Sequence, residues 1–127
     1  MNRMLNVLIG EYEGIIAADL KSLFNSWGWS KPYVTKDLKD VEQKSLFSKF
    51  ELVIIDENII KNESVFALIT QLVISGKSRV IFLADSFNHT IPENLNNCAS
   101  FYCLSKPFNY SELANAVHSG QYRSAAM

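Results

Sequence analysis

The chain has 127 residues, of which 48% are hydrophobic and 20% charged, and its formal net charge at pH 7 is −1. This length fits one domain with its own core. The near-neutral charge, without a block of Lys or Arg, gives no support for nucleic acid or an anionic membrane as a partner. No apolar run of about 18 residues and no N-terminal signal core occurs, so we expect a cytoplasmic domain without a membrane span.

Apolar segments of two kinds alternate along the chain. Short runs that predict strands lie at 5–9, 32–35, 51–56, 79–84 and 101–104. Apolar residues at helical spacing predict helices at 15–27, 37–46, 64–73 and from about 109 to 117, with a loop and one short helix between 85 and 97. Strands that alternate with helices of about 10 to 15 residues predict a parallel sheet. The fold class expected from the residues is therefore a three-layer α/β sandwich.

Some single residues carry further expectations. Leu46 is expected to face the core, and the tail 121–127, which has no apolar pattern, is expected to be frayed. Cys98 and Cys103 are expected to be free thiols rather than a disulfide. The candidate helix N-caps are Asp37, Asn62 or Ser64, and Asn109 or Ser111.

Polar side chains end three of the predicted strands. Glu11 follows the first strand, Asp56 ends the third and Lys106 follows the fifth. Ligands of open parallel sheets bind beyond the carboxyl ends of the strands, so these side chains are expected to lie along one edge. Carboxylate oxygens suit Mg²⁺, and lysine suits a phosphate group. An aspartate can also accept a phosphoryl group covalently. The set therefore indicates a site for a divalent cation and an anionic group.

Three segments carry a resemblance to a known family: 7–13, which holds Glu11, 51–56, which ends in Asp56, and 104–108, which holds Lys106-Pro107. Together they resemble the receiver domain of bacterial response regulators in two-component signalling. The resemblance implies a five-stranded parallel sheet of flavodoxin-like topology, with strand order 2-1-3-4-5. It also implies a single receiver-like domain over 1–127, with its core at about 5–122 and no output domain.

The resemblance assigns roles to particular residues. Asp56 matches the residue that accepts a phosphoryl group from a histidine kinase or phosphotransfer protein, and Lys106 matches the lysine that contacts that group. The family's Lys-Pro bond, here Lys106-Pro107, is usually cis. Mg²⁺ is expected on Glu11, Asp56 and the backbone carbonyl of Asn58. The signal is expected to pass to a downstream protein or through self-association, and no enzyme activity is expected.

Three positions depart from the family's pattern. Tyr12 stands where the second acid of the metal-binding pair is expected, and a neutral phenol is a poor Mg²⁺ ligand, so we interpret Tyr12 as a lid over a weakened site. Ala84 stands at the switch Ser/Thr position, followed by Asp85, whose charge would repel a phosphoryl group. Cys103 replaces the switch aromatic residue. These departures leave two functions open: a phosphoacceptor receiver, or a pseudo-receiver that acts by protein binding without phosphorylation.

A nucleotide-binding or other small α/β enzyme is a third class of function. The sequence contains no glycine-rich phosphate loop and no nucleophile–base pair on the predicted site edge. The enzyme class is therefore disfavoured.

Overall fold

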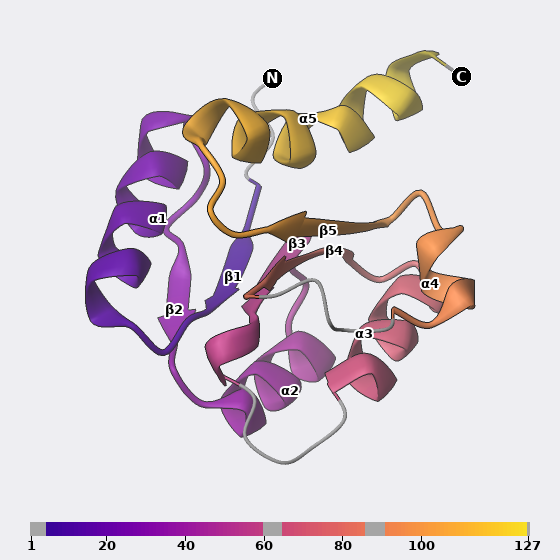
Figure 1. Cartoon of the computed structure of the whole chain (residues 1–127), viewed down its shortest axis with the longest axis horizontal. Coiled ribbons are helices and arrows are strands. Elements are labelled where there is room, and N and C mark those ends of the chain that lie inside the picture. Colours follow the sequence, from indigo (N-terminus) through magenta and orange to yellow (C-terminus); the bar gives the residue numbers. More distant parts are fainter. Residues whose placement is uncertain (1–4, 60–64, 86–90, 127) are drawn as a thin grey trace.

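The computed structural model describes residues 5–59, 65–85 and 91–126, of which 119–126 are described by their backbone alone. Strands and helices alternate along the chain (Figure 1). In order they are β1 (Val7–Gly10), α1 (Gly14–Ser26), β2 (Tyr33–Thr35), α2 (Leu38–Phe47), β3 (Leu52–Asp56), a 3₁₀ turn (Glu57–Ile59), α3 (Val65–Ile74), β4 (Arg79–Ala84), α4 (Glu93–Asn96), β5 (Phe101–Ser105) and α5 (Tyr110–Ala126).

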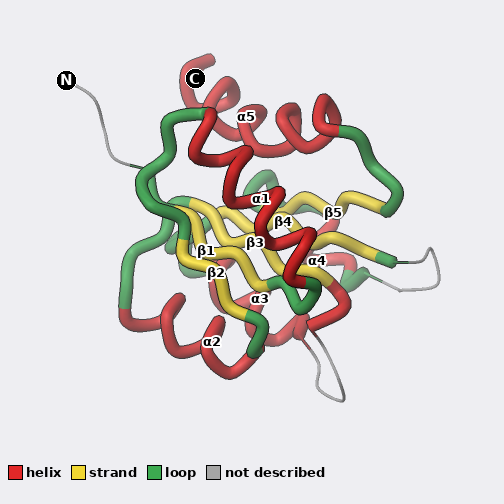
Figure 2. The backbone as a smooth tube through the Cα atoms, turned by 90° about the vertical axis from the view of Figure 1, so that its left-hand side faces the viewer, coloured by secondary structure: helices red, strands yellow, loops and turns green. Residues whose placement is uncertain are grey.

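The strands form one parallel sheet in the order β2-β1-β3-β4-β5. Helices α1 and α5 cover one face of this sheet, and α2 and α3 lie against the other (Figure 2). The predicted three-layer sandwich and its strand order are confirmed. Because all strands run the same way, their carboxyl ends meet at one edge of the sheet.

The alternation of side chains along β3 explains its nearly continuous apolar sequence. Leu52 and Ile54 point into the core beneath α1 and α5, whereas Val53 and Ile55 point into the core beneath α2 and α3. All four are fully buried, as expected for a strand that is covered on both faces. Asp56 comes next in the same strand and is fully buried as well, so packing on both sides fixes the position of its carboxylate.

Gly10 closes β1 at a point of tight packing. A Cβ atom at this position would lie 2.9 Å from Val41 Cγ2 and 3.2 Å from Ile59 Cδ1. Only glycine therefore lets the end of β1 approach α2 and the turn that follows β3 so closely. This approach sets Glu11 beside the end of β3.

The predicted caps can be compared with the structure at two helices. Asp37 Oδ1 accepts a hydrogen bond from the Lys39 N–H at 3.1 Å. Asn109 Oδ1 accepts from the Glu112 N–H at 2.8 Å, and Glu112 Oε1 accepts from the Asn109 N–H at 3.1 Å. This reciprocal pair is a capping box, so Asn109 rather than Ser111 caps α5. Asn62 and Ser64 lie outside the described residues.

Two expectations were wrong. Leu46 is 37% exposed, and the inner position on α2 is taken by Ser45, because a helix places residue 45, four after Val41, on the buried face. The buried Ser45 hydroxyl donates a hydrogen bond to the Glu42 carbonyl at 3.1 Å, so its polar group has a partner. The tail is helical rather than frayed over 121–126, because α5 continues to Ala126, and Met127 lies outside the described residues. Residues such as Gln121 and Arg123 are good helix formers, which an apolar pattern alone does not register.

Two further expectations concern the cysteines and the membrane. Cys98 and Cys103 are free and half-buried, as expected. Among the helices of the described residues, none is long and apolar enough to span a bilayer.

Candidate functional site

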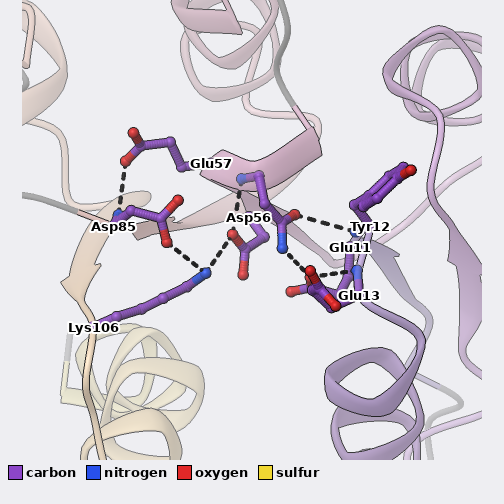
Figure 3. Close-up of polar contacts among 8 residues, drawn as sticks. Glu11, Tyr12, Glu13, Asp56, Glu57, Asp85 and Lys106 are labelled. Atoms are coloured by element: carbon purple, nitrogen blue, oxygen red, sulfur yellow. Dashed lines mark hydrogen bonds and ion pairs between the residues drawn. The ribbon is translucent and has the colours of Figure 1, made fainter.

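Four charged side chains meet where the strands end. Glu11 follows β1, Asp56 is the last residue of β3, Asp85 follows β4 and Lys106 follows β5. In the sheet, β1 pairs with β3, β3 with β4 and β4 with β5, so these residues come from four strands in a row. Figure 3 shows their side chains converging on one region, as the sequence predicted for Glu11, Asp56 and Lys106.

Lys106 lies between two carboxylates. Its Nζ donates to Asp56 Oδ1 at 2.6 Å and lies 2.8 Å from Asp85 Oδ1 (Figure 3). The Lys106 N–H continues the sheet by donating to the Ala84 carbonyl at 2.9 Å, and the Lys106-Pro107 bond is cis, as expected. Burial lowers the pKa of Lys106, but the contacts with Asp56 and Asp85 outweigh it and raise the pKa. The ammonium group is therefore charged across the physiological range.

Asp56 uses one of its two carboxylate oxygens. Oδ1 accepts from Lys106 and also from the Asn58 N–H at 3.0 Å. Oδ2 is buried and has no hydrogen-bond partner among the described residues. Leaving a buried carboxylate oxygen unpaired costs free energy, so such atoms mark places where a proton, a cation or a reacting group can bind.

Glu11 has the same asymmetry. Its Oε2 accepts from the Glu13 N–H at 3.0 Å and from the Asn58 side-chain amide, whereas its buried Oε1 has no partner among the described residues. Burial, followed by the contact with the Asp56 carboxyl, raises the pKa of Glu11 to about 7. The pair Glu11–Asp56 is thus two buried acids, of which one readily holds a proton near neutral pH.

The side chain of Asn58 ties the two loops of the site together. Its Nδ2 donates to Glu11, and its Oδ1 accepts from the Tyr12 N–H at 3.1 Å. The sequence assigned Asn58 only a backbone role. The role of its side-chain amide is one that sequence reasoning missed. The available signal was a side chain, two residues after Asp56, that can both donate and accept hydrogen bonds.

Tyr12 contributes its backbone rather than its ring. The side chain is 53% exposed, and Figure 3 shows the ring pointing away from Glu11 and Asp56. In this structure, Tyr12 therefore does not cover the carboxylates as a lid. Because position 12 holds a tyrosine, no second carboxylate directly follows Glu11.

The fit of the site to Mg²⁺ follows from these donors. No group of three or more His, Cys, Asp or Glu side chains is placed to hold a metal in the parts of the chain that the structure describes. Two carboxylate oxygens, Glu11 Oε1 and Asp56 Oδ2, are nevertheless buried and have no hydrogen-bond partner among the described residues. Mg²⁺ completes its coordination with water and needs few protein carboxylates, so two acids fit a weak site.

The resemblance assigns a switch role to positions 84 and 103, which here hold alanine and cysteine. Ala84 is 3% exposed and belongs to the apolar core. Cys103 is half-buried, and burial together with the charge of Glu57 raises the pKa of its thiol, so it is not a reactive thiolate. Tyr102, one residue earlier in β5, is 42% exposed.

The geometry can be compared with known proteins. No sequence-family description matches the chain, and a search of curated proteins gave no match. Solved structures do match: a signal receiver domain of a putative LuxO repressor from Vibrio parahaemolyticus has a TM-score of 0.79 at 19% identity, over 98% of this chain and 95% of that one. The receiver domain of an HD domain-containing protein from Pseudomonas fluorescens gives 0.78 at 16% identity, over 98% and 100%. The chain has the receiver fold.

A third receiver-fold structure bears on the site. It is a response regulator from Thermotoga maritima in complex with Mg²⁺-BeF, with a TM-score of 0.75 at 19% identity over 92% of this chain and 99% of that one. At these identities the likeness concerns the fold, so the roles of Asp56, Lys106 and Glu11 depend on their own geometry.

Proposed function

We propose that this chain is a cytoplasmic response-regulator receiver that accepts a phosphoryl group on Asp56 from a histidine kinase or phosphotransfer protein. One observation carries the proposal. On a receiver fold, the buried Asp56 carboxylate at the end of β3 lies 2.6 Å from Lys106, which precedes a cis proline, and its second oxygen has no hydrogen-bond partner in the described part of the chain. This arrangement supplies both a nucleophile and a fixed cation for the incoming charge.

The hydrogen bonds of Asp56 indicate which of its carboxylate oxygens takes part in phosphoryl transfer. Asp56 Oδ1 is held by Lys106 and Asn58, so Oδ2 is the oxygen that attacks phosphorus. The O–P bond forms while the P–N bond of the donor phosphohistidine breaks, and its electron pair stays on the imidazole nitrogen, which takes up a proton. Lys106 neutralises the phosphoryl oxygens. Because Oδ2 is buried, docking of the phosphoryl donor must expose this oxygen.

Mg²⁺ would be held by Glu11 Oε1, Asp56 Oδ2 or a phosphoryl oxygen, and the Asn58 backbone carbonyl. When bound, it would supply positive charge to the phosphoryl oxygens. Asn58 keeps Glu11 oriented through its side-chain amide. A receiver of this kind transmits its state to a downstream protein or by self-association.

A second function is favoured by a different observation. Asp56 is completely buried, and the only lysine at the site already contacts two carboxylates in the described part of the chain. With Ala84 in place of a hydroxyl residue, a pseudo-receiver that binds its partner without phosphorylation has the same fold and needs none of the chemistry.

Beryllofluoride with Mg²⁺ separates the two functions, because it mimics a phosphoryl group on an aspartate. We expect the wild-type amide signals of residues 56–58, 84–85 and 106 to shift in NMR spectra at millimolar Mg²⁺, and the Asp56→Asn variant to show no shift. A wild-type spectrum that stays unchanged at saturating beryllofluoride and Mg²⁺ would favour the pseudo-receiver.

A further inference from the structure

Asp85, which directly follows β4, contacts the lysine of the site. Its carboxylate Oδ1 lies 2.8 Å from Lys106 Nζ, on the cation that also holds Asp56. Figure 3 shows Lys106 between Asp56 and Asp85, with the two carboxylates on different sides of the ammonium group. One lysine thus serves two acids from neighbouring strands.

The backbone of Asp85 is also fixed. Its N–H donates to Glu57 Oε1 at 2.7 Å, which ties the end of β4 to the turn after β3. The side chain of Asp85 is 47% exposed, whereas that of Lys106 is 23% exposed and that of Asp56 is fully buried. Asp85 is therefore the solvent-side acceptor of the lysine, and Asp56 is the inner one.

A solvent-exposed ion pair contributes little to the stability of a fold, so stabilisation alone does not explain the contact of Asp85 with Lys106. Its charge matters more for what else can approach Lys106. A phosphoryl group on Asp56 brings about two negative charges and strong acceptor oxygens that need the same ammonium donors. The Asp85 carboxylate offers Lys106 that contact in advance and repels the incoming group.

We propose that Asp85 is a built-in competitor of the phosphoryl group: its carboxylate occupies Lys106 and must be displaced before the group on Asp56 can bind the lysine. This inference rests on the proposed function. It makes Asp85 a regulatory residue that sets how readily Asp56 takes up a phosphoryl group. Loss of the Asp85–Lys106 contact is the direct structural consequence of phosphoryl uptake.

The test measures the half-saturating concentration of beryllofluoride at fixed saturating Mg²⁺, by amide shifts in NMR spectra, for the wild type and Asp85→Asn. Asparagine keeps the size of the side chain and removes its charge. We expect the half-saturating concentration to fall on the order of tenfold, since one close charge repulsion is removed. Raising the ionic strength should lower the wild-type value more than the Asp85→Asn value, because salt screens the repulsion.

Glu42→Gln is the matched control. Glu42 is an exposed residue in the middle of α2, and its substitution changes the net charge by the same amount. We expect its beryllofluoride response to equal that of the wild type. Dispersed amide spectra of both variants establish that they are folded.

The outcomes distinguish this inference from the function beneath it. Equal half-saturation in the wild type and Asp85→Asn, or weaker binding in Asp85→Asn, overturns the role of Asp85 and leaves the phosphoacceptor function standing. A response in Asp85→Asn alone supports the competitor and, by the beryllofluoride criterion given above, assigns the wild type to the pseudo-receiver function. No response in any of the three proteins overturns the phosphoacceptor function and this inference with it.

Discussion

Lys106→Met is expected to destabilise the protein by about 2–4 kcal/mol and to abolish its beryllofluoride response. The substitution leaves the fully buried Asp56 carboxylate without its cation, and removing one partner of a buried ion pair is costly because the other charge stays behind. Asp85 adds its negative charge to the same region. The free energy of unfolding, measured with urea at pH 7, gives the loss directly.

A double-mutant cycle separates this electrostatic cost from lost packing. Asp56→Asn removes the buried charge, so the double variant Asp56→Asn/Lys106→Met should recover at least half of the stability that Lys106→Met loses. A loss below about 1 kcal/mol in Lys106→Met, or no recovery in the double variant, would show that the pair behaves as an ordinary surface contact.

Glu11 is expected to make the stability of the metal-free protein fall as the pH rises from about 5 to about 8. Burial and the neighbouring Asp56 raise its pKa in the folded protein from the ordinary 4.5 of a glutamate to about 7. The folded state therefore binds a proton that the unfolded state has released in this window, so raising the pH favours unfolding. The contribution of Glu11 is fully present at low pH and is lost as the pH passes about 7.

Glu11→Gln should remove that slope. Glutamine stays neutral at every pH, so the variant should exceed the wild type by about 2 kcal/mol at pH 8 in EDTA and match it near pH 5. Unfolding in urea at several pH values measures the difference. Glu13→Gln, an exposed substitution in the same loop, should keep the wild-type slope. Identical slopes in the wild type and Glu11→Gln would contradict the buried, proton-holding state of Glu11.

The same variant tests the metal. Mg²⁺ competes with the proton for Glu11, so added Mg²⁺ should stabilise the wild type more at pH 8 than at pH 6. Glu11→Gln, which has no carboxylate to offer, should gain little at either pH. Equal stabilisation of the two proteins would place the cation elsewhere.

Much of this architecture follows from apolar pattern. The runs that became β3 and β4 are buried on both faces, and parallel strands bring their carboxyl ends together. The meeting of Glu11, Asp56 and Lys106 could therefore be predicted before any coordinates. The choice of Asn109 as the cap of α5 also follows a local rule, since Glu112 three residues later completes the capping box.

What could not be predicted depends on contacts between side chains from different strands. The sequence placed Asp85 as a source of repulsion, but its bond to Lys106 depends on where the segment after β4 sets the carboxylate. The amide of Asn58 finds Glu11 only because Gly10 lets β1 approach the turn after β3. The burial of Asp56 Oδ2 likewise depends on tertiary packing, which the apolar pattern of β3 does not specify atom by atom.

The most direct test of the central claim is whether Asp56 becomes phosphorylated. The wild type and Asp56→Asn are incubated with Mg²⁺ and a phosphorylated histidine donor, either a phosphotransfer protein or the small-molecule mimic phosphoramidate, and analysed by intact mass spectrometry. We predict a gain of one phosphoryl group in the wild type, mapped to Asp56 after reductive trapping of the acyl phosphate, and none in Asp56→Asn. A wild-type protein that stays unmodified, or a phosphoryl group that persists in Asp56→Asn, would contradict the assignment.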